Sequence, residues 1–224
     1  MSRRVAILRP EPGNAATVER ALRAGLDPLV LPLFTVRPLA WEPPVPQTFD
    51  GLLFTSANAI RYGGIGLSEL LALPVLAVGT ATAETARDAG FNVIRTGATD
   101  IADLLRDAQG YERLLWLTGR ERTAIDHPAL ALAVPVYASD TVELGAIDAE
   151  TLRGTVALVH SARAGAHLAA ELARHDIPRG AVRIAAISTK AAAAAGDGWA
   201  LIAVAPTPDD DALIAVARRL AIDP

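Results

Sequence analysis

The sequence contains no cysteine, a single lysine and few aromatic residues, which make up 4% of its 224 residues. Without cysteine the chain cannot form disulfides, thiolate zinc sites or iron–sulfur clusters, and it has no cysteine nucleophile. Lys190 is the single lysine, and the other basic residues are arginines. This preference reflects either codon usage or the ability of arginine to bind carboxylates bidentately. The net charge of −4 gives no overall basic field, so we expect no nucleic-acid partner.

Long apolar runs are also absent. The apolar run at residues 5–8 is too short for a signal peptide, and no run in the sequence approaches the roughly 20 residues of a membrane span. We therefore expect a cytoplasmic protein with no membrane partner. Hydrophobic residues still make up 51% of the sequence, which is enough for a buried core.

Short apolar segments alternate with helical patterns along the chain, which is typical of parallel sheets with crossover helices. We expect strands at residues 5–8, 29–31, 51–55, 75–78, 92–94, 114–118, 134–137, 156–160, 184–187 and 201–204. Helices are expected between them, among others at residues 80–89, 101–108, 121–132, 163–175 and 209–220. Residues 36–46 carry four prolines and no helical period, so this segment is interpreted as a linker.

An internal repeat divides the chain. Residues 53–59, Leu-Phe-Thr-Ser-Ala-Asn-Ala, resemble residues 158–164, Leu-Val-His-Ser-Ala-Arg-Ala, and in both an apolar strand ends in Ser-Ala and enters a helix. A second matching pair follows at residues 78–83 and 187–192. Two strand–turn–helix segments thus recur in the same order, which predicts two homologous halves.

We therefore predict an α/β protein of two similar open parallel-sheet domains, Rossmann-like or flavodoxin-like, joined by a two-stranded connector with a ligand cleft between them. The first domain is discontinuous and comprises residues 1–37 and 142–224, since its N-terminal part supplies only two strands and the C-terminal third must complete it. The inserted domain comprises residues 47–137, and residues 38–46 and 138–141 are the connectors.

Small polar residues gather at the predicted carboxyl ends of the strands, where open parallel sheets bind their ligands. The set is rich in hydroxyls, glycine and arginine and consists of Arg9, Thr55, Ser56, Gly79, Thr80, Thr118, Gly119, Arg120, Ser161, Ser188 and Thr189. Backbone amides and hydroxyls in this arrangement bind anions, and arginine adds charge. The alternative at each serine or threonine is a helix cap alone. As a set, these residues predict a site for a polyanion.

The motifs of several other functions are absent from the sequence. No Gly-x-Gly-x-x-Gly follows a strand, and the sequence has neither a Walker loop nor a Gly-x-Ser-x-Gly elbow. His127, His160, His167 and His175 do not have metal-ligand spacing with acidic partners. The acidic triplet at residues 209–211 is interpreted as a helix cap rather than a metal site. We therefore expect neither a metal nor a cofactor.

Together, these motifs resemble the uroporphyrinogen-III synthase family. The resemblance rests on residues 8–11 (Leu-Arg-Pro-Glu), 54–59, 78–83, 136–137 and 160–163, which occur in the family's order over essentially the whole chain. It implies a cofactor-free lyase of tetrapyrrole and heme biosynthesis. Its substrate would be the linear tetrapyrrole hydroxymethylbilane, which is closed to uroporphyrinogen III with loss of water and inversion of the terminal pyrrole ring. The carboxylates of this substrate suit a site of amides and hydroxyls.

The resemblance also assigns residues. Tyr137 matches the family's tyrosine beside the second connector and becomes the candidate to donate a hydrogen bond or a proton to the departing hydroxyl. Its alternative role is that of a packed aromatic at a strand end. Thr82 and Ser161 match positions that line the family's cleft. Ser56, Gly79 and Thr80 lie on matching motifs.

The chain departs from the family at one late motif. Where many members have Gly-Pro-Thr-Thr, residues 188–191 are Ser-Thr-Lys-Ala, so the threonine pair is only partly present and a substrate contact by Lys190 is left open. Two other functions also stay open, namely a non-catalytic ligand-sensing module of the same two-domain fold and a different two-domain α/β enzyme with an anionic substrate. We expect a monomer, because neither half shows a spare apolar face. Transient contact with neighbouring pathway enzymes is left open.

Overall fold

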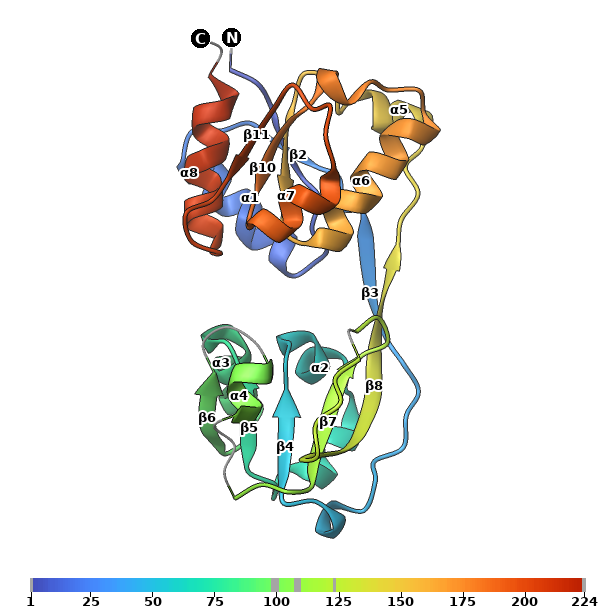
Figure 1. The fold of residues 1–224 in the computed structure, drawn as a ribbon, viewed down its shortest axis with the longest axis vertical. Helices are drawn as coiled ribbons and strands as arrows, with labels where there is room; N and C mark the ends of the chain where they lie inside the picture. Colours follow the sequence, from blue (N-terminus) through green and yellow to red (C-terminus); the bar gives the residue numbers. More distant parts are fainter. Residues whose placement is uncertain (1, 98–100, 107–109, 123, 223–224) are drawn as a thin grey trace. The chain divides into compact units, whose positions relative to one another are not determined.

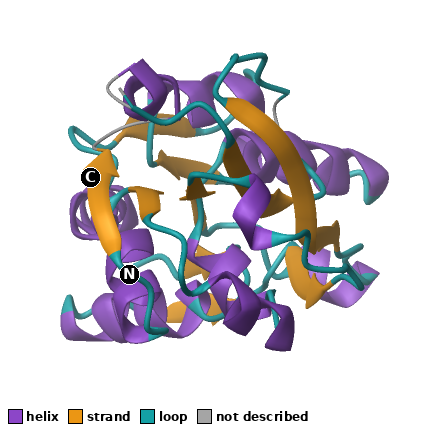
Figure 2. Cartoon of the chain, turned by 90° about the horizontal axis from the view of Figure 1, so that it is seen from below, coloured by secondary structure: helices purple, strands orange, loops and turns teal. Residues whose placement is uncertain are grey.

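The computed structural model describes residues 2–97, 101–106, 110–122 and 124–222. The chain forms two compact units, Met1–Thr35 with Asp140–Pro224, and Val36–Ser139. Each unit has its own sheet with helices packed on it, as the ribbon in Figure 1 and the orange strands among purple helices in Figure 2 show. The predicted domain boundaries and the predicted cleft stay predictions.

The first unit contains a five-stranded sheet in the order β11-β10-β9-β1-β2. Neighbouring strands in this sheet are parallel. The strands are β1 (Val5–Ile7), β2 (Pro28–Val30), β9 (Val156–Val159), β10 (Arg183–Ala186) and β11 (Leu201–Val204). The prediction that the C-terminal third completes a sheet begun by the first two strands is therefore confirmed.

Helices cover both faces of this sheet. Helices α1 (Gly13–Arg23) and α8 (Asp210–Ala221) lie on one face, and α6 (Ala162–Arg174) and α7 (Thr189–Ala195) lie on the other, with the short α5 (Ala146–Glu150) before β9. Successive side chains of β1 serve both cores: Ile7 packs with α8, and Leu8 just beyond the strand packs with α6. Burial on both faces explains why these strands are continuous apolar runs.

The second unit contains a six-stranded sheet in the order β3-β8-β7-β4-β5-β6. Its strands are β3 (Phe34–Pro38), β4 (Gly51–Phe54), β5 (Val75–Val78), β6 (Val93–Gly97), β7 (Leu114–Gly119) and β8 (Leu130–Thr141). Helices α2 (Ala57–Tyr62) and α3 (Thr80–Asp88) pack on one face and α4 (Ile101–Arg106) on the other. Residues 107 and 108 of the predicted helix 101–108 lie outside the described residues.

The two sheets share one spatial arrangement of five parallel strands. Strands β4, β5, β6, β7 and β8 correspond to β9, β10, β11, β1 and β2, so the first sheet is a circular permutation of the second. Numbered in chain order, the parallel strands of the first sheet have the flavodoxin-like order 2-1-3-4-5, and those of the second have the order 3-2-1-4-5, with which the Rossmann order begins. Ser56 after β4 and Ser161 after β9 each cap the following helix. The internal repeat of the sequence therefore corresponds to a repeated structural unit.

The predicted helix at residues 121–132 is wrong. The described residues between β7 and β8 have no helical turn, and β8 already begins at Leu130. Pro128 lies inside the predicted segment, where it removes an amide donor and disfavours the helical conformation of His127. A loop therefore stands in the second unit where the first unit has α1, between its equivalent strands β1 and β2.

The predicted linker at residues 36–46 is wrong in part, because its first residues belong to β3 beside β8. The Leu39 amide donates to the Val136 carbonyl at 3.0 Å, and the Val142 amide donates to the Leu33 carbonyl at 2.9 Å. These bonds pair the two segments in opposite order, so β3 runs antiparallel to β8. Pro38 is tolerated because β3 is an edge strand. The chain thus passes between its units along two paired strands.

Candidate functional site

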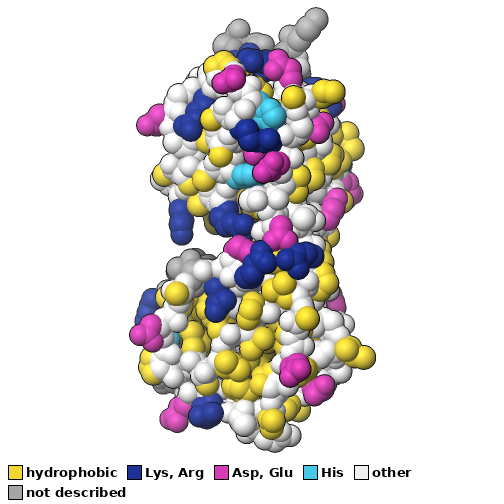
Figure 3. Space-filling view, turned by 90° about the vertical axis from the view of Figure 1, so that its right-hand side faces the viewer, with side chains coloured by type: hydrophobic (Ala, Val, Ile, Leu, Met, Phe, Trp, Pro, Cys, Tyr) yellow, Lys and Arg dark blue, Asp and Glu magenta, His cyan; other side chains and the backbone are white. Residues whose placement is uncertain are grey.

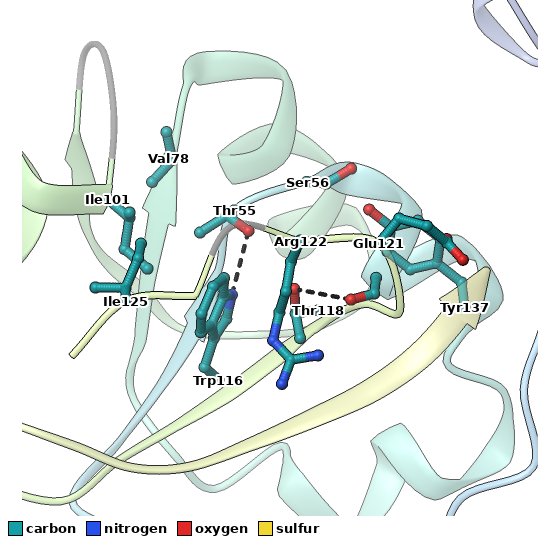
Figure 4. Close-up of a pocket in the computed structure, with 11 residues that line it drawn as sticks. Thr55, Ser56, Val78, Ile101, Trp116, Thr118, Glu121, Arg122, Ile125 and Tyr137 are labelled. Carbon is teal, nitrogen blue, oxygen red and sulfur yellow. Dashed lines mark hydrogen bonds between the residues drawn. The ribbon is translucent and has the colours of Figure 1, made fainter. Parts of the chain in front are cut away.

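A cavity of about 340 Å³ lies in the second unit at the carboxyl ends of its central strands (Figure 4). Its lining consists of Thr55, Ser56, Val78, Ile101, Trp116, Thr118, Gly119, Glu121, Arg122, Ile125 and Tyr137. Strands β4 and β7 are neighbours at this point, whereas the segments that follow them leave to different sides of the sheet. This is the topological switch point at which open α/β sheets bind ligands. The volume suits a small ligand or part of a larger one.

One end of the cavity is apolar. Val78, Ile101 and Ile125 lie on the Trp116 side of the cavity in Figure 4, away from Tyr137. Trp116 is only 4% exposed, and its indole N–H donates to the Thr55 hydroxyl oxygen at 3.2 Å. The ring is therefore held in one orientation, with Thr55 at the end of β4 as its anchor.

Tyr137 and Gly119 pack together at the other, polar end. The pairing of β7 with β8 shifts here, because Thr118 lies opposite Pro135 but Gly119 lies opposite Tyr137. Such a bulge changes the direction of a side chain at a strand end. The Arg120 amide donates to the Tyr137 carbonyl at 2.8 Å and holds the bulge. A Cβ on residue 119 would lie 2.8 Å from Cζ of Tyr137, so the ring position requires glycine.

Glu121 supplies the negative charge of the lining. Its carboxylate accepts hydrogen bonds from the Ser139 amide at 3.0 Å and from the Arg120 guanidinium. Burial acts to raise the pKa of Glu121, but the bonds from Ser139 and Arg120 outweigh it and hold the pKa below its ordinary value. Glu121 is therefore ionised at neutral pH, and Arg120 is directed to this carboxylate.

The structure brings four of the predicted site residues together in this lining: Thr55, Ser56, Gly119 and Tyr137. The Ser56 hydroxyl also accepts a hydrogen bond from the Asn58 amide at 3.2 Å, so it caps α2 as well as facing the cavity. Thr118, which the sequence also predicts at a strand end, lies in the same lining.

Four other predicted residues of the second unit lie nearby in the fold but outside this lining. Gly79 and Thr80 form the turn into α3, and Gly79 has φ +79°, a conformation that favours glycine. Thr82 is buried within α3, and Arg120 is paired with Glu121. Gly79, Thr80 and Thr82 therefore shape the turn and the helix, Arg120 binds Glu121, and none of the four lines this cavity.

Sequence reasoning missed Trp116, Glu121, Arg122 and Ile125. Trp116 precedes Thr118 by two residues on β7, so strand alternation places both on the same face. Glu121, Arg122 and Ile125 belong to the predicted helix 121–132, and Pro128 is the sequence signal against that helix.

The predicted residues of the first unit also lie at carboxyl ends of strands. The Ser161 hydroxyl accepts a hydrogen bond from the Ala164 amide at 3.1 Å, and the Ser188 hydroxyl accepts one from the Ala191 amide at 3.2 Å. Both serines are therefore helix caps. Thr189 and Lys190 follow in the first turn of α7 and are exposed.

Arg9 follows β1 and belongs to a charged cluster around Asp210. Arg9 donates to the Thr17 hydroxyl at 3.3 Å and lies 3.8 Å from the Asp210 carboxylate. Asp210 also accepts from Thr17 at 2.8 Å, from Arg20 at 3.1 Å and lies 2.8 Å from Nε2 of His160. Desolvation lowers the pKa of His160, against the effect of Asp210. Burial acts to raise the pKa of Asp210, but the bonds from His160 and Thr17 outweigh it and lower the pKa.

The acidic triplet is a cap, as predicted. The Asp209 carboxylate accepts a hydrogen bond from the Ala212 amide at 2.8 Å at the start of α8. Among the residues that the structure describes, no group of three or more His, Asp or Glu side chains is placed to hold a metal ion.

No helix in the described part of the chain is long and apolar enough to span a membrane. Acidic and basic side chains are interspersed over each unit on the face drawn in Figure 3.

A sequence profile of the family HEM4, described as uroporphyrinogen-III synthase HemD, matches residues 15–215. The chain belongs to the uroporphyrinogen-III synthase family. This assigns it to a family of lyases in tetrapyrrole biosynthesis, as the resemblance of its motifs indicated. Comparison with curated proteins gives no match.

Solved structures of the family have the same fold. The uroporphyrinogen-III synthetase of Helicobacter pylori is similar with a TM-score of 0.68 and 18% identity, over 98% of this chain and 100% of that one. A mutant uroporphyrinogen III synthase of the extremely thermophilic bacterium Thermus thermophilus gives a TM-score of 0.56 and 19% identity, over 97% and 98% of the two chains. At these identities the likeness shows the two-domain α/β fold alone.

Proposed function

We propose that this member of the uroporphyrinogen-III synthase family converts hydroxymethylbilane into uroporphyrinogen III and water. The observation that carries the proposal is the family match over residues 15–215. The cavity at the switch point supports it, because its polar end offers hydroxyls and a tyrosine. This arrangement suits a reaction in which holding the substrate matters more than reactive side chains.

The proposed reaction begins with cleavage of the C–O bond of the hydroxymethyl group. The leaving hydroxyl takes up a proton and departs as water, and an azafulvene cation remains. The substituted carbon of the last pyrrole attacks this cation and gives a spiro-pyrrolenine. Rearrangement then inverts that ring, and loss of one proton restores the pyrrole, so the product differs from the substrate by one water.

Tyr137 is the proposed donor to the leaving hydroxyl. Its ring lies in the cavity lining, and the bulge and Gly119 fix its position. A tyrosine hydroxyl carries a proton that it can donate in a hydrogen bond. The proton released when the pyrrole is restored returns Tyr137 to its starting state. We propose no metal and no cofactor.

The proposed contacts to the substrate carboxylates come from the predicted set. In the second unit they are Thr55, Ser56, Gly79, Thr80, Thr82, Gly119 and Arg120, and in the first unit Arg9, Ser161, Ser188 and Thr189. Several of these residues lie at helix N-termini, which supports this role. The backbone amides of the first helical turn that the cap does not bind attract anions. The proposal further includes a monomer acting in the cytoplasm, which sedimentation and cell fractionation test.

The test is incubation of freshly made hydroxymethylbilane with the protein, followed by oxidation and chromatographic separation of the porphyrin isomers. Without inversion the linear substrate closes to isomer I. The proposal requires isomer III at a rate proportional to protein concentration. Isomer I alone, at the rate of the solution without protein, would show that the chain is not a synthase.

A further inference from the structure

Arg122 is the cation of the cavity lining, and it lies against an aromatic face. Its guanidinium carbon is 5.8 Å from the centroid of the Trp116 ring, which is within cation–π distance. Figure 4 shows the arginine side chain extended beside that ring. The Trp116 indole is itself fixed by its bond to Thr55. The guanidinium thus rests on a wall of the cavity whose orientation is set by the sheet.

The carboxylate in the cavity lining binds other groups, so the Arg122 guanidinium can bind a ligand. Glu121, the carboxylate of the lining, is bound by Arg120 and the Ser139 amide. Within the described part of the chain, no carboxylate lies within ion-pair distance of Arg122. A guanidinium held beside an aromatic ring can still present its planar fork of N–H groups to a carboxylate and bind it bidentately.

The apolar side chains of the cavity indicate what the carboxylate is attached to. Val78, Ile101 and Ile125 line the same space as Trp116. A flat, electron-rich heterocycle with an acidic side chain would place its ring among these residues and its charge at Arg122.

We propose that Arg122, held within cation–π distance of Trp116, binds a carboxylate side chain of one substrate pyrrole and selects for acid-bearing rings. That the bound ring belongs to hydroxymethylbilane rests on the proposed function. The binding of a single acid-bearing ring at Arg122 needs only the cavity of the second unit. Arg122 is here a binding residue, so its loss changes the apparent affinity and leaves the chemical step unchanged.

The probe is porphobilinogen, a single pyrrole with an acetate and a propionate, and its dimethyl ester. Binding is followed by the NMR signal of the Trp116 indole N–H, assigned by its loss in Trp116→Phe. The wild type should bind the acid at least about tenfold more tightly than the ester, and Arg122→Gln should bind both alike. Arg122→Lys should retain part of the preference, because it keeps the charge but not the planar fork. Arg87→Gln, an exposed arginine in the last turn of α3, is the matched control and should bind as the wild type does.

Equal binding of acid and ester by the wild type, no binding of either, or an unchanged preference in Arg122→Gln would overturn the proposal. The isomer assay on the wild type is read separately. If the wild type makes isomer III and Arg122→Gln has an unchanged KM, Arg122 is wrongly assigned and the synthase function stands. If the wild type makes no isomer III but loses the acid preference in Arg122→Gln, the synthase function fails and the pyrrole-acid site stands.

Discussion

The position of a Cβ on Gly119 would be 2.8 Å from Cζ and 3.0 Å from the hydroxyl oxygen of Tyr137. Glycine at the end of β7 therefore leaves the space that the tyrosine ring of the cavity occupies. The bulge between β7 and β8 and the bond from the Arg120 amide add to this constraint. The geometry makes Gly119 a positioning residue for Tyr137.

Gly119→Ala should displace the Tyr137 ring. We expect a loss of about 1–3 kcal/mol in the free energy of unfolding, typical of an overpacked site, and a fall in kcat. Chemical denaturation and the isomer assay measure the two effects. Gly145→Ala is the control, because its nearest atom would be 3.8 Å away and its φ of −68° suits any residue. Wild-type stability and kcat in Gly119→Ala would show that the ring position is not constrained in this way.

Tyr137→Phe should leave the packing nearly unchanged and remove only the hydroxyl. We expect kcat to fall by at least about tenfold, since a general acid contributes at least that much, with little change in binding of uroporphyrinogen III. Steady-state kinetics and product titration separate the two quantities. Tyr62→Phe in α2 controls for the loss of a tyrosine hydroxyl elsewhere. Wild-type turnover in Tyr137→Phe removes this residue from the mechanism.

The first unit should lose stability in acid through His160 and Asp210. Desolvation holds the folded pKa of His160 below that of the unfolded chain, so below about pH 6.5 the unfolded state binds more protons and stability falls. The lowered pKa of Asp210 extends the loss to lower pH. The melting temperature measured between pH 7.5 and pH 5 should decrease. It should decrease less in His160→Gln, and an identical pH dependence in that variant would contradict this account.

Ser161→Ala tests whether the serine that follows β9 does more than cap α6. Loss of its bond to the Ala164 amide should cost about 1 kcal/mol of stability, as for other N-caps. If the hydroxyl also binds the substrate, KM for hydroxymethylbilane should rise as well. Ser161→Asp keeps the cap but adds a negative charge, so it should restore stability and raise KM further. A stability loss in Ser161→Ala with wild-type KM would limit this residue to its cap.

The sequence predicts the sheets and their strand ends well, because parallel strands buried on both faces are uninterrupted apolar runs. Arg9, Thr55 and Ser161 were placed correctly at strand ends for this reason. The loop that carries Arg122 differs from the predicted helix because Pro128 disfavours the helical conformation that the surrounding residues otherwise indicate. The packing of Gly119 on Tyr137 depends on a register shift between two strands, which residue periodicity does not reveal.

The most direct test of the central claim is the isomer composition of the product as a function of protein concentration at a fixed, freshly made supply of hydroxymethylbilane. If the chain is the synthase, the share of uroporphyrinogen III rises with protein until spontaneous closure is outcompeted. At that point isomer I becomes a minor product. A product that stays isomer I at every protein concentration would contradict the account.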